Sequence, residues 1–430
     1  MVIIYCRMKF NRRNFIRSAS VLAALSLSEI EALGRTPLAT PADGDITDDE
    51  QYWASVRQNF PLAKDLAYLN NGTMGPSPYP VIDAVHKGMM EGDMHGGYGG
   101  WETTAAKLAR FVGADEDEIA LTHNVTDGIN IACWGYPLKK GDEVILTTHE
   151  HVGNAFPWLN RQKLHGIVIK AYTPGATAHE TLNNIEALIT KKTRVIATPH
   201  IPCTQGQVIP VKEICRMAKE KGIFCAIDGA HGPGMLPLDL HDMGCDTYAS
   251  CCHKWMLGPK GTGFLYVRKE LQDTIQTYFV GGGSDMGTWN TATVPITSTG
   301  YAHSAHRYYG GTQAAGLYKG VDAAIDFIET IGMENIHRRI KALGKYTQDQ
   351  LLAIGDKVEM LTPTEDRSRC GVNGFRIKGV AFGDFCNTCS ENKVRIRGVG
   401  ENGLKSLRVS THIYNTKEEI DRLVELVKKA

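Results

Sequence analysis

Between residues 98 and 266, segments with helical spacing of apolar residues alternate with short apolar runs rich in β-branched residues. This alternation predicts an α/β fold, in which a mainly parallel sheet is covered by helices on both faces. The predicted strands are 143–148, 194–198, 223–228, 247–250 and 263–268. Unusual polar residues follow the carboxyl ends of these runs, which is the edge where open α/β sheets bind ligands.

The pattern changes after residue 320, which predicts a smaller α+β domain. Helices are expected at 321–330 and 336–354, and strands around Phe375, Val394 and Leu407. A final helix has a clear start, because Thr416 and Glu419 form a capping box ahead of an apolar face. The glycine-rich stretch 281–300 is expected to be a long loop that acts as a lid or an interface.

We predict four segments along the chain. Residues 1–40 are a signal and tail, 41–75 an N-terminal arm, 76–320 a large domain and 321–430 a small C-terminal domain. Arg12-Arg13-Asn14-Phe15-Ile16-Arg17 precedes an apolar stretch too short to span a bilayer, so no stable membrane anchor is expected. The motif resembles a twin-arginine signal, which predicts export to the periplasm by that machinery; the alternative is a basic amphipathic helix.

Composition gives little information about partners. Lys+Arg and Asp+Glu both number 47 in the 430 residues, so no nucleic-acid partner is indicated. The 11 cysteines are scattered rather than regularly spaced. Cys386 and Cys389 form a CxxC, but no second pair or histidine follows at zinc spacing, and no metal is expected.

The central chemical feature is Lys254, in the sequence Ser250-Cys251-Cys252-His253-Lys254-Trp255. It follows a predicted strand and precedes a glycine-rich loop that lets backbone approach a ligand closely. A lysine in this position can form an imine with an aldehyde if its pKa is depressed. Alone, such a lysine is usually an ordinary surface residue.

Three other motifs supply complementary groups. Asp228 ends an apolar strand, where it can pair with a protonated pyridine nitrogen, and His231 follows it. Val125 and Thr126 precede a helical stretch expected to begin near Ile129, and a helix N-terminus is suited to phosphate. His151 can place an imidazole flat on an aromatic ring.

Together these motifs resemble the class V aminotransferase and cysteine desulfurase family, which consists of pyridoxal 5′-phosphate (PLP) enzymes of fold type I. The resemblance covers about residues 65–429 and is closest to isopenicillin N epimerase-like proteins, whose lysine motif reads Cys-His-Lys-Trp. It implies that the large domain binds PLP and that the substrate is an amino acid. It also implies a homodimer with shared active sites.

The resemblance assigns roles residue by residue. Lys254 matches the Schiff-base lysine and acid/base, Asp228 the pyridine partner and His231 the group near the phenolic oxygen. His151 matches the stacking residue, and Arg408 the arginine that binds the substrate carboxylate. The phosphate positions are Val125, Thr126, Cys251 and His253, with Gly311 and Thr312 contributed by the second subunit. Cys203 stands where relatives have asparagine or serine near the phenolic oxygen.

The reaction is less constrained than the cofactor. An aminotransferase or epimerase is the first expectation. Cysteine desulfurases need a nucleophilic cysteine on a loop before the final arginine, and none lies between Arg395 and Arg408. Cysteine desulfurase or carbon–sulfur lyase activity is the alternative, because Cys370, Cys386 and Cys389 lie upstream. A non-catalytic binding protein that keeps the fold is a third hypothesis.

The export prediction can be tested directly. Replacing both Arg12 and Arg13 by lysine is expected to retain the protein in the cytoplasm, because the signal depends on the arginine pair. Cell fractionation and immunoblotting measure the distribution. Unchanged export of the double variant would contradict the assignment.

Overall fold

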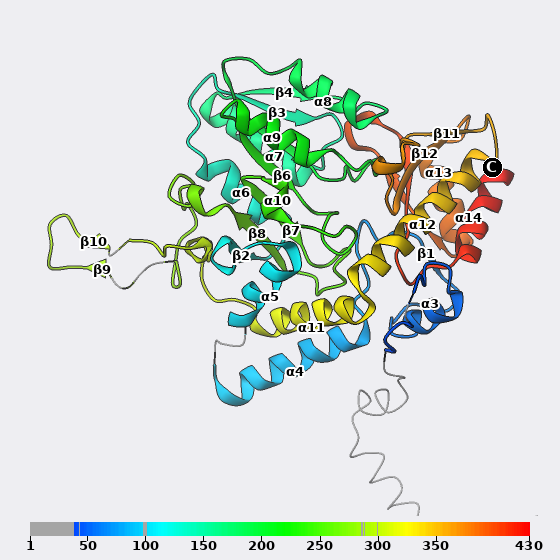
Figure 1. Cartoon of the computed structure of the whole chain (residues 1–430), viewed down its shortest axis with the longest axis horizontal. Helices are drawn as coiled ribbons and strands as arrows, with labels where there is room; N and C mark the ends of the chain where they lie inside the picture. The colour runs from blue at the N-terminus through cyan, green and yellow to red at the C-terminus, as the bar shows by residue number, and fades with distance from the viewer. Residues whose placement is uncertain (1–37, 43, 98–100, 285–286, 288, 299) are drawn as a thin grey trace, which may run out of the picture. The chain divides into compact units, whose positions relative to one another are not determined.

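A seven-stranded sheet forms the centre of the larger part of the fold (Figure 1). The computed structural model describes residues 38–430 except 43, 98–100, 285–286, 288 and 299, so the twin-arginine motif lies outside the described residues. The strand order is β2-β8-β7-β6-β5-β3-β4. The bounds are β2 (Ile119–Thr122), β3 (Glu143–Thr147), β4 (Val168–Tyr172), β5 (Thr193–Pro199), β6 (Phe224–Asp228), β7 (Thr247–Cys251) and β8 (Gly263–Val267).

The sheet is mainly parallel, as predicted, with one reversed strand. All five predicted strands are present, but β8 runs antiparallel to both β7 and β2. The link between β7 and β8, residues 252–262, contains no helix, and a parallel connection needs a longer crossover. The short strand β2 and the edge strand β4 were not predicted.

Helices pack against this sheet and set the positions of the loops at its edge. Helix α6 (Val125–Gly135) packs against β6, β7 and β8, and α9 (Val211–Glu220) packs against β6. The prediction that the first of these begins near Ile129 was wrong. Asn124 starts it one turn earlier, because its side-chain oxygen accepts a hydrogen bond from the Asp127 amide at 3.1 Å.

The C-terminal part contains a second sheet, with four antiparallel strands in the order β11-β12-β15-β14. The predicted strands near 375 and 407 belong to it. The strand near 394 does not: β13 (Val394–Arg395) pairs in parallel with β1 (Ala67–Tyr68) of the N-terminal arm. The bounds are β11 (Val358–Met360), β12 (Val372–Ile377), β14 (Arg397–Val399) and β15 (Ser406–Ser410).

Two long helices follow the large sheet in sequence, and the second of them packs against β11 and β12. The two predicted helices are α11 (Ala315–Ile331) and α12 (Met333–Leu352), and both begin earlier than expected. The capping box of α14 (Lys417–Lys429) is confirmed, and its apolar face is buried. The core here includes Leu343, Phe375, Val409, Ile420 and Leu423. Thr40–Ala430 forms a single compact unit, so the boundary proposed at residue 320 stays a prediction.

The remaining elements lie around these two sheets. The predicted loop 281–300 contains a short antiparallel hairpin of β9 (Trp289–Asn290) and β10 (Thr297–Ser298), which projects from the fold (Figure 1). Its role as a lid or interface stays a prediction. The other α-helices are α3 (Glu50–Arg57), α4 (Tyr79–His95), α5 (Glu102–Val112), α7 (Val152–His165), α8 (Ala178–Glu186), α10 (Leu240–Met243) and α13 (Phe382–Glu391).

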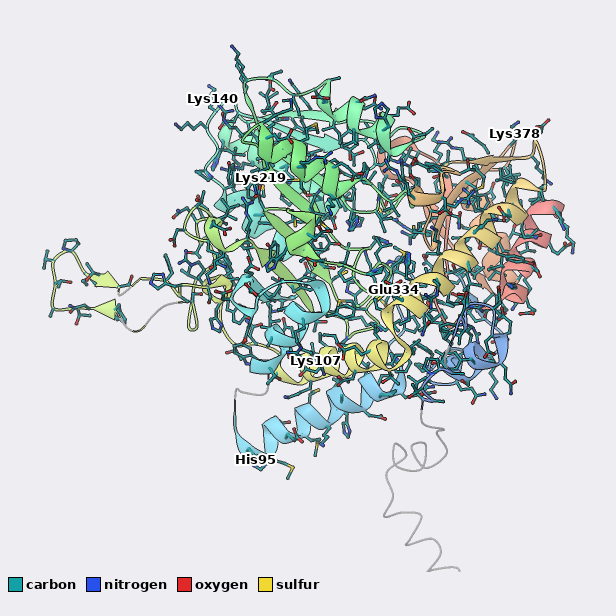
Figure 2. All side chains as sticks on the ribbon, viewed as in Figure 1. His95, Lys107, Lys140, Lys219, Glu334 and Lys378 are labelled. Carbon is teal, nitrogen blue, oxygen red and sulfur yellow. The ribbon has the colours of Figure 1, made fainter. Side chains whose placement is uncertain are left out.

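Most charged side chains lie at the periphery. Lys140 and Lys378 are exposed and project from the outer edges of the molecule (Figure 2). Among the described helices, none has the length and apolar character required to cross a membrane. Two arginines, Arg339 and Arg408, are by contrast almost completely buried.

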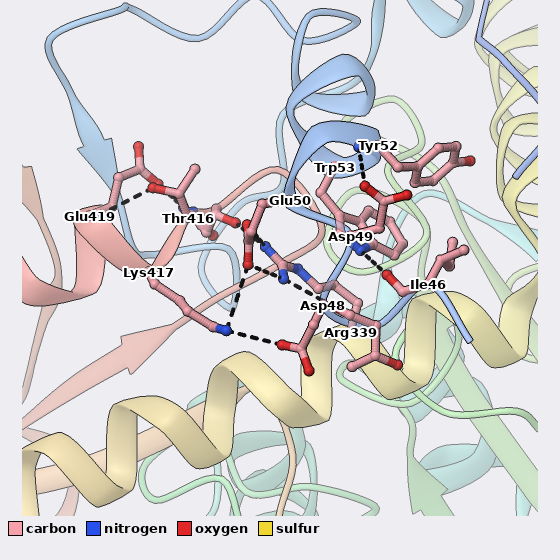
Figure 3. Close-up of polar contacts among 12 residues, drawn as sticks. Ile46, Asp48, Asp49, Glu50, Tyr52, Trp53, Arg339, Thr416, Lys417 and Glu419 are labelled. Carbon is pink, nitrogen blue, oxygen red and sulfur yellow. Dashed lines mark hydrogen bonds and ion pairs between the residues drawn. The ribbon is translucent and has the colours of Figure 1, made fainter. Parts of the chain in front are cut away.

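Arg339 joins the N-terminal arm to α12 (Figure 3). Its two terminal nitrogens each lie 2.7 Å from a carboxylate oxygen of Glu50, a bidentate geometry. The guanidinium also lies 5.6 Å from the ring centroid of Trp53. Lys417 of α14 pairs with Asp48 and Glu50 on the same arm, so several ionic contacts hold the arm to the C-terminal part (Figure 3).

Arg339→Ala is expected to lower the free energy of unfolding by about 2–4 kcal/mol, because it removes a buried cation with several partners. Urea denaturation measures the change. Arg338→Ala, on the exposed side of the same helix, is the control and should stay within about 0.5 kcal/mol of the parent. Equal effects of the two substitutions would contradict the role of Arg339.

Candidate active site

The predicted site residues converge on one cavity of about 250 Å³. The cavity lies at the carboxyl ends of β5, β6 and β7, next to the N-terminus of α6, as expected for an α/β sheet. It brings together Val125, Thr126, His151, Cys203, Asp228, His231, Cys251, His253, Lys254 and Arg408. Gly311 and Thr312 do not line it.

Lys254 faces the imidazole of His231, and a hydrogen bond from Trp255 fixes the orientation of that ring. Trp255 Nε1 donates a hydrogen bond to His231 Nδ1 at 3.0 Å, and His231 Nε2 lies 3.3 Å from Lys254 Nζ. Burial, followed by the charge of Lys254, holds the pKa of His231 well below its usual range. A neutral ring that accepts at Nδ1 has its hydrogen on Nε2. The Nε2 side of the ring thus faces Lys254 Nζ and holds the amine in position.

The Lys254 loop is sealed on one side by the N-terminal arm. The Gly75 amide donates to the His253 carbonyl at 2.8 Å. A Cβ on Gly75 would lie only 2.1 Å from the Lys254 carbonyl oxygen. Residue 75 must therefore be glycine for the arm to approach the lysine this closely.

Asp228 is a buried carboxylate with an incomplete set of partners. It is 5% exposed, and one oxygen accepts a hydrogen bond from the Ala230 amide at 2.9 Å. Burial raises the pKa of Asp228, and the Ala230 amide, Lys254 and His151 oppose that shift. A protonated ring nitrogen beside this carboxylate would supply the missing cationic partner.

The opposite end of the cavity is suited to an anion. The N-terminus of α6 contributes Val125 and Thr126, and Cys251 and His253 line the same wall. His253 Nδ1 is buried and has no hydrogen-bond partner among the described residues. An unpartnered polar atom of this kind indicates that a ligand group binds there.

His151 lies at the start of α7. Its Nδ1 accepts a hydrogen bond from the Gly153 amide at 3.0 Å, which caps the helix and fixes the ring. Burial, then Lys254, lowers the pKa of His151, so the ring is neutral at pH 7. The cavity position agrees with a stacking role, which stays a prediction.

Arg408 is held by residues that sequence analysis missed. Its terminal nitrogens donate to Asn70 Oδ1 at 2.9 Å, to Thr73 Oγ1 at 2.6 Å and to the Cys203 carbonyl at 3.0 Å. Burial, then Arg397, lowers the pKa of Arg408 to about 10, so it stays charged at pH 7. Its Nε has no partner among the described residues. Nη2 uses both of its hydrogens, so Nε–H and one Nη1–H are the donors left for a ligand.

Arg397 is a second cation in the cavity, and sequence analysis did not select it. It lies opposite Arg408 in the β14–β15 register and forms an ion pair with Glu401. Its Nη1 lies 3.8 Å from Cys203 Sγ. The basic run Arg395-Ile396-Arg397 could have drawn attention to it only with the strand register in hand.

Gly311 and Thr312 line a different cavity, of about 560 Å³, together with His123, Tyr278 and Phe279. The resemblance assigned this pair to the phosphate site of a second subunit. Their separation from the Lys254 cavity agrees with that assignment but does not test it.

A family model described as "Aminotransferase class-V" matches residues 84–423. The chain belongs to the class-V aminotransferase family. Curated relatives are similar over almost their whole length. A probable cysteine desulfurase of Pyrococcus abyssi is 28% identical, with 87% of this chain and 97% of that protein covered. A cysteine desulfurase of Haloferax volcanii is also 28% identical, with 85% and 89% covered.

Solved structures show the same fold. A mutant of C-DES with glycine covalently linked to its PLP cofactor has a TM-score of 0.78 at 25% identity, covering 86% of this chain and 98% of that one. The apo structure of a cysteine desulfurase from Thermococcus onnurineus NA1 has a TM-score of 0.77 at 23% identity, covering 87% and 96%. The class-V fold predicted from sequence is thus confirmed.

PLP is the cofactor of this class-V enzyme, and the cavity residues fit it. An amine for the aldehyde, a buried carboxylate for the ring nitrogen and a helix N-terminus for the phosphate are all present. The relatives reported above are named cysteine desulfurases rather than isopenicillin N epimerases. These relatives therefore do not support the predicted resemblance to isopenicillin N epimerase-like proteins.

The hydrogen bond from Trp255 to His231 allows a test of how the imidazole supports cofactor binding. Trp255→Phe is expected to slow uptake of PLP by the apoprotein about tenfold, because loss of one buried hydrogen bond frees the imidazole to change its proton position. The change in visible absorbance measures uptake. Trp53→Phe, which removes an equivalent buried indole bond to Ile46 far from the cavity, is the control. Equal rates in both variants would contradict the role of Trp255.

Proposed function

We propose that this enzyme cleaves the carbon–sulfur bond of a cysteine-type amino acid, as a cysteine desulfurase or carbon–sulfur lyase. The observation that supports this most directly is the similarity to proteins named cysteine desulfurase over 85–88% of the chain at 28–29% identity. The arrangement of cavity residues is compatible with that chemistry.

Each of the main cavity residues has a separate role in the proposed reaction. When bound, PLP stabilises negative charge at the substrate α-carbon, which permits loss of a proton and then of a β-substituent. Arg408 attracts the α-carboxylate with its charge and with the donors that Asn70, Thr73 and the Cys203 carbonyl leave unused. Lys254 takes up the α-proton, and the neutral His231 keeps the amine oriented. Asp228 balances the positive ring nitrogen.

The positions of the cysteines favour a lyase over a thiol-dependent desulfurase. Of the described cysteines, only Cys203 and Cys251 line the cavity, and burial raises the pKa of both thiols. Cys370 donates to the Gly206 carbonyl at 2.9 Å, and Cys386 lies on α13. A buried, protonated thiol is a poor nucleophile. In a lyase no enzyme thiol receives the sulfur, which departs as part of the group released from the substrate β-carbon.

An aminotransferase or epimerase is the second candidate. The lack of a cysteine between Arg395 and Arg408 is compatible with it. The non-catalytic alternative is weaker, because Lys254, Asp228 and Arg408 meet in one cavity.

We further propose a homodimer in which Gly311 and Thr312 contribute to the phosphate site of the partner subunit. We also propose that the protein is exported through the twin-arginine route.

The function is tested by a product panel. The PLP-loaded enzyme is incubated separately with cysteine, with S-substituted cysteines and with alanine. The products measured are sulfide, persulfide, pyruvate and, in the cysteine reactions, alanine. Exchange of the α-proton is measured alongside. Sulfur release is expected, and Lys254→Ala should reduce it by at least about 10²–10⁴-fold. Keto acid formation or α-proton exchange without sulfur release would replace the proposal by transamination or epimerisation.

A further inference from the structure

A second histidine, His412, packs against the residue that orients His231. The rings of His412 and Trp255 stack, with centroids 5.5 Å apart and an interplanar angle of 21°. Both side chains are completely buried. His412 does not line the Lys254 cavity, so any effect on the site must pass through a neighbour.

Two hydrogen bonds fix the hydrogen on the His412 ring. Nδ1 accepts from the Ile413 amide at 2.7 Å, so the hydrogen of the neutral ring is on Nε2. Nε2 donates to the Trp255 carbonyl at 3.0 Å. Burial lowers the pKa of His412 to about 4, so the ring is neutral at pH 7. His412 is therefore a directed donor to the backbone of the residue that follows Lys254.

Further contacts limit the movement of the two stacked rings. Tyr414 also stacks on the His412 imidazole, with centroids 5.5 Å apart and planes 5° from parallel. The Tyr414 hydroxyl donates to Asn71 Oδ1 of the N-terminal arm at 3.0 Å. A Cβ on Gly371 would lie 3.1 Å from Cη2 of Trp255, so the far end of the indole lies against backbone.

The contacts form a continuous chain that ends at the Schiff-base lysine. His412 Nε2 donates to the Trp255 carbonyl, and Trp255 Nε1 donates to His231 Nδ1. His231 Nε2 then lies 3.3 Å from Lys254 Nζ. His412 follows β15, the strand that carries Arg408. The segment that supplies the arginine of the cavity thus also holds the loop that supplies the lysine.

The two hydrogen bonds of His412 have different purposes. The Nδ1 bond satisfies the amide of the next residue, Ile413, and is purely local. The Nε2 bond and the stacking are both directed at Trp255, which lies 157 residues away in sequence. Only these long-range contacts can influence the site.

We propose that His412 is a positioning residue of the active site: its Nε2–H holds the Trp255 backbone and thereby fixes the indole that orients His231. It is not a catalytic residue, because it acts only through Trp255. This role does not depend on which substrate bond the enzyme breaks, and it stands even if carbon–sulfur cleavage is disproved.

Two substitutions separate the hydrogen bonds of His412. A glutamine amide nitrogen can occupy the position of Nε2, so His412→Gln retains the donor to Trp255 and loses the acceptor for the Ile413 amide. His412→Asn does the reverse, because its carbonyl oxygen can occupy the position of Nδ1. Both substitutions remove the ring, so the loss of stacking is matched.

The direct readout is the indole N–H resonance of Trp255 in PLP-loaded enzyme that contains ¹⁵N-labelled tryptophan. Trp255→Phe identifies the signal. His412→Asn should shift this resonance upfield, because a weaker hydrogen bond to His231 deshields the proton less, and His412→Gln should leave it near the parent position. Trp53, whose indole donates to the Ile46 carbonyl at 2.8 Å, is the internal reference and should not move.

Uptake of PLP by the apoprotein is the functional readout. His412→Asn should slow uptake about tenfold, as expected for Trp255→Phe, and His412→Gln should stay within about threefold of the parent. Adding His412→Asn to Trp255→Phe should cause no further decrease, because the bond through which His412 acts is already absent.

Thermal melts check that each variant is folded. If His412→Asn does not fold, His412→Phe takes its place, since it keeps an aromatic ring in the stack and lacks the donor. An unmoved Trp255 resonance in the donor-lacking variant would overturn the proposal. So would an effect of His412→Gln as large as that of His412→Asn, or additive effects in the double variant.

Discussion

A guanidinium buried on an inner strand of a sheet requires partners for most of its donors, and Arg408 on β15 obtains them from two separate parts of the chain. The arm supplies Asn70 and Thr73, and the loop after β5 supplies the Cys203 carbonyl. An unpartnered buried charge would cost several kcal/mol. This requirement brings the arm, the central sheet and the second sheet together at the Lys254 cavity.

The cavity beside Arg408 contains both charged and neutral side chains. Two guanidiniums stay charged, while burial keeps the imidazoles of His231 and His151 neutral. Asp228 and Glu401 supply negative charge at different places, Asp228 in the cavity wall and Glu401 beside Arg397.

Much of this arrangement could be predicted from sequence, because the residues of the cavity follow strands with strong apolar patterns. Asp228 and Lys254 were identified in this way. Asn70, Thr73 and Arg397 were missed, because their importance depends on contacts between distant segments. Asn70 lies 338 residues from Arg408 in sequence, and no local pattern indicates such a pair. The reversed direction of β8 was missed for a related reason, since apolar runs do not specify strand direction.

The close approach of Gly75 to Lys254 has a consequence for recognising active and inactive copies of this enzyme. A copy could retain Lys254, Asp228 and Arg408 and still lose function through a side chain at residue 75, because any Cβ there collides with the Lys254 carbonyl. Inspection of the catalytic motifs alone would classify such a copy as active. A glycine in the arm is therefore as diagnostic of a working site as the lysine it contacts.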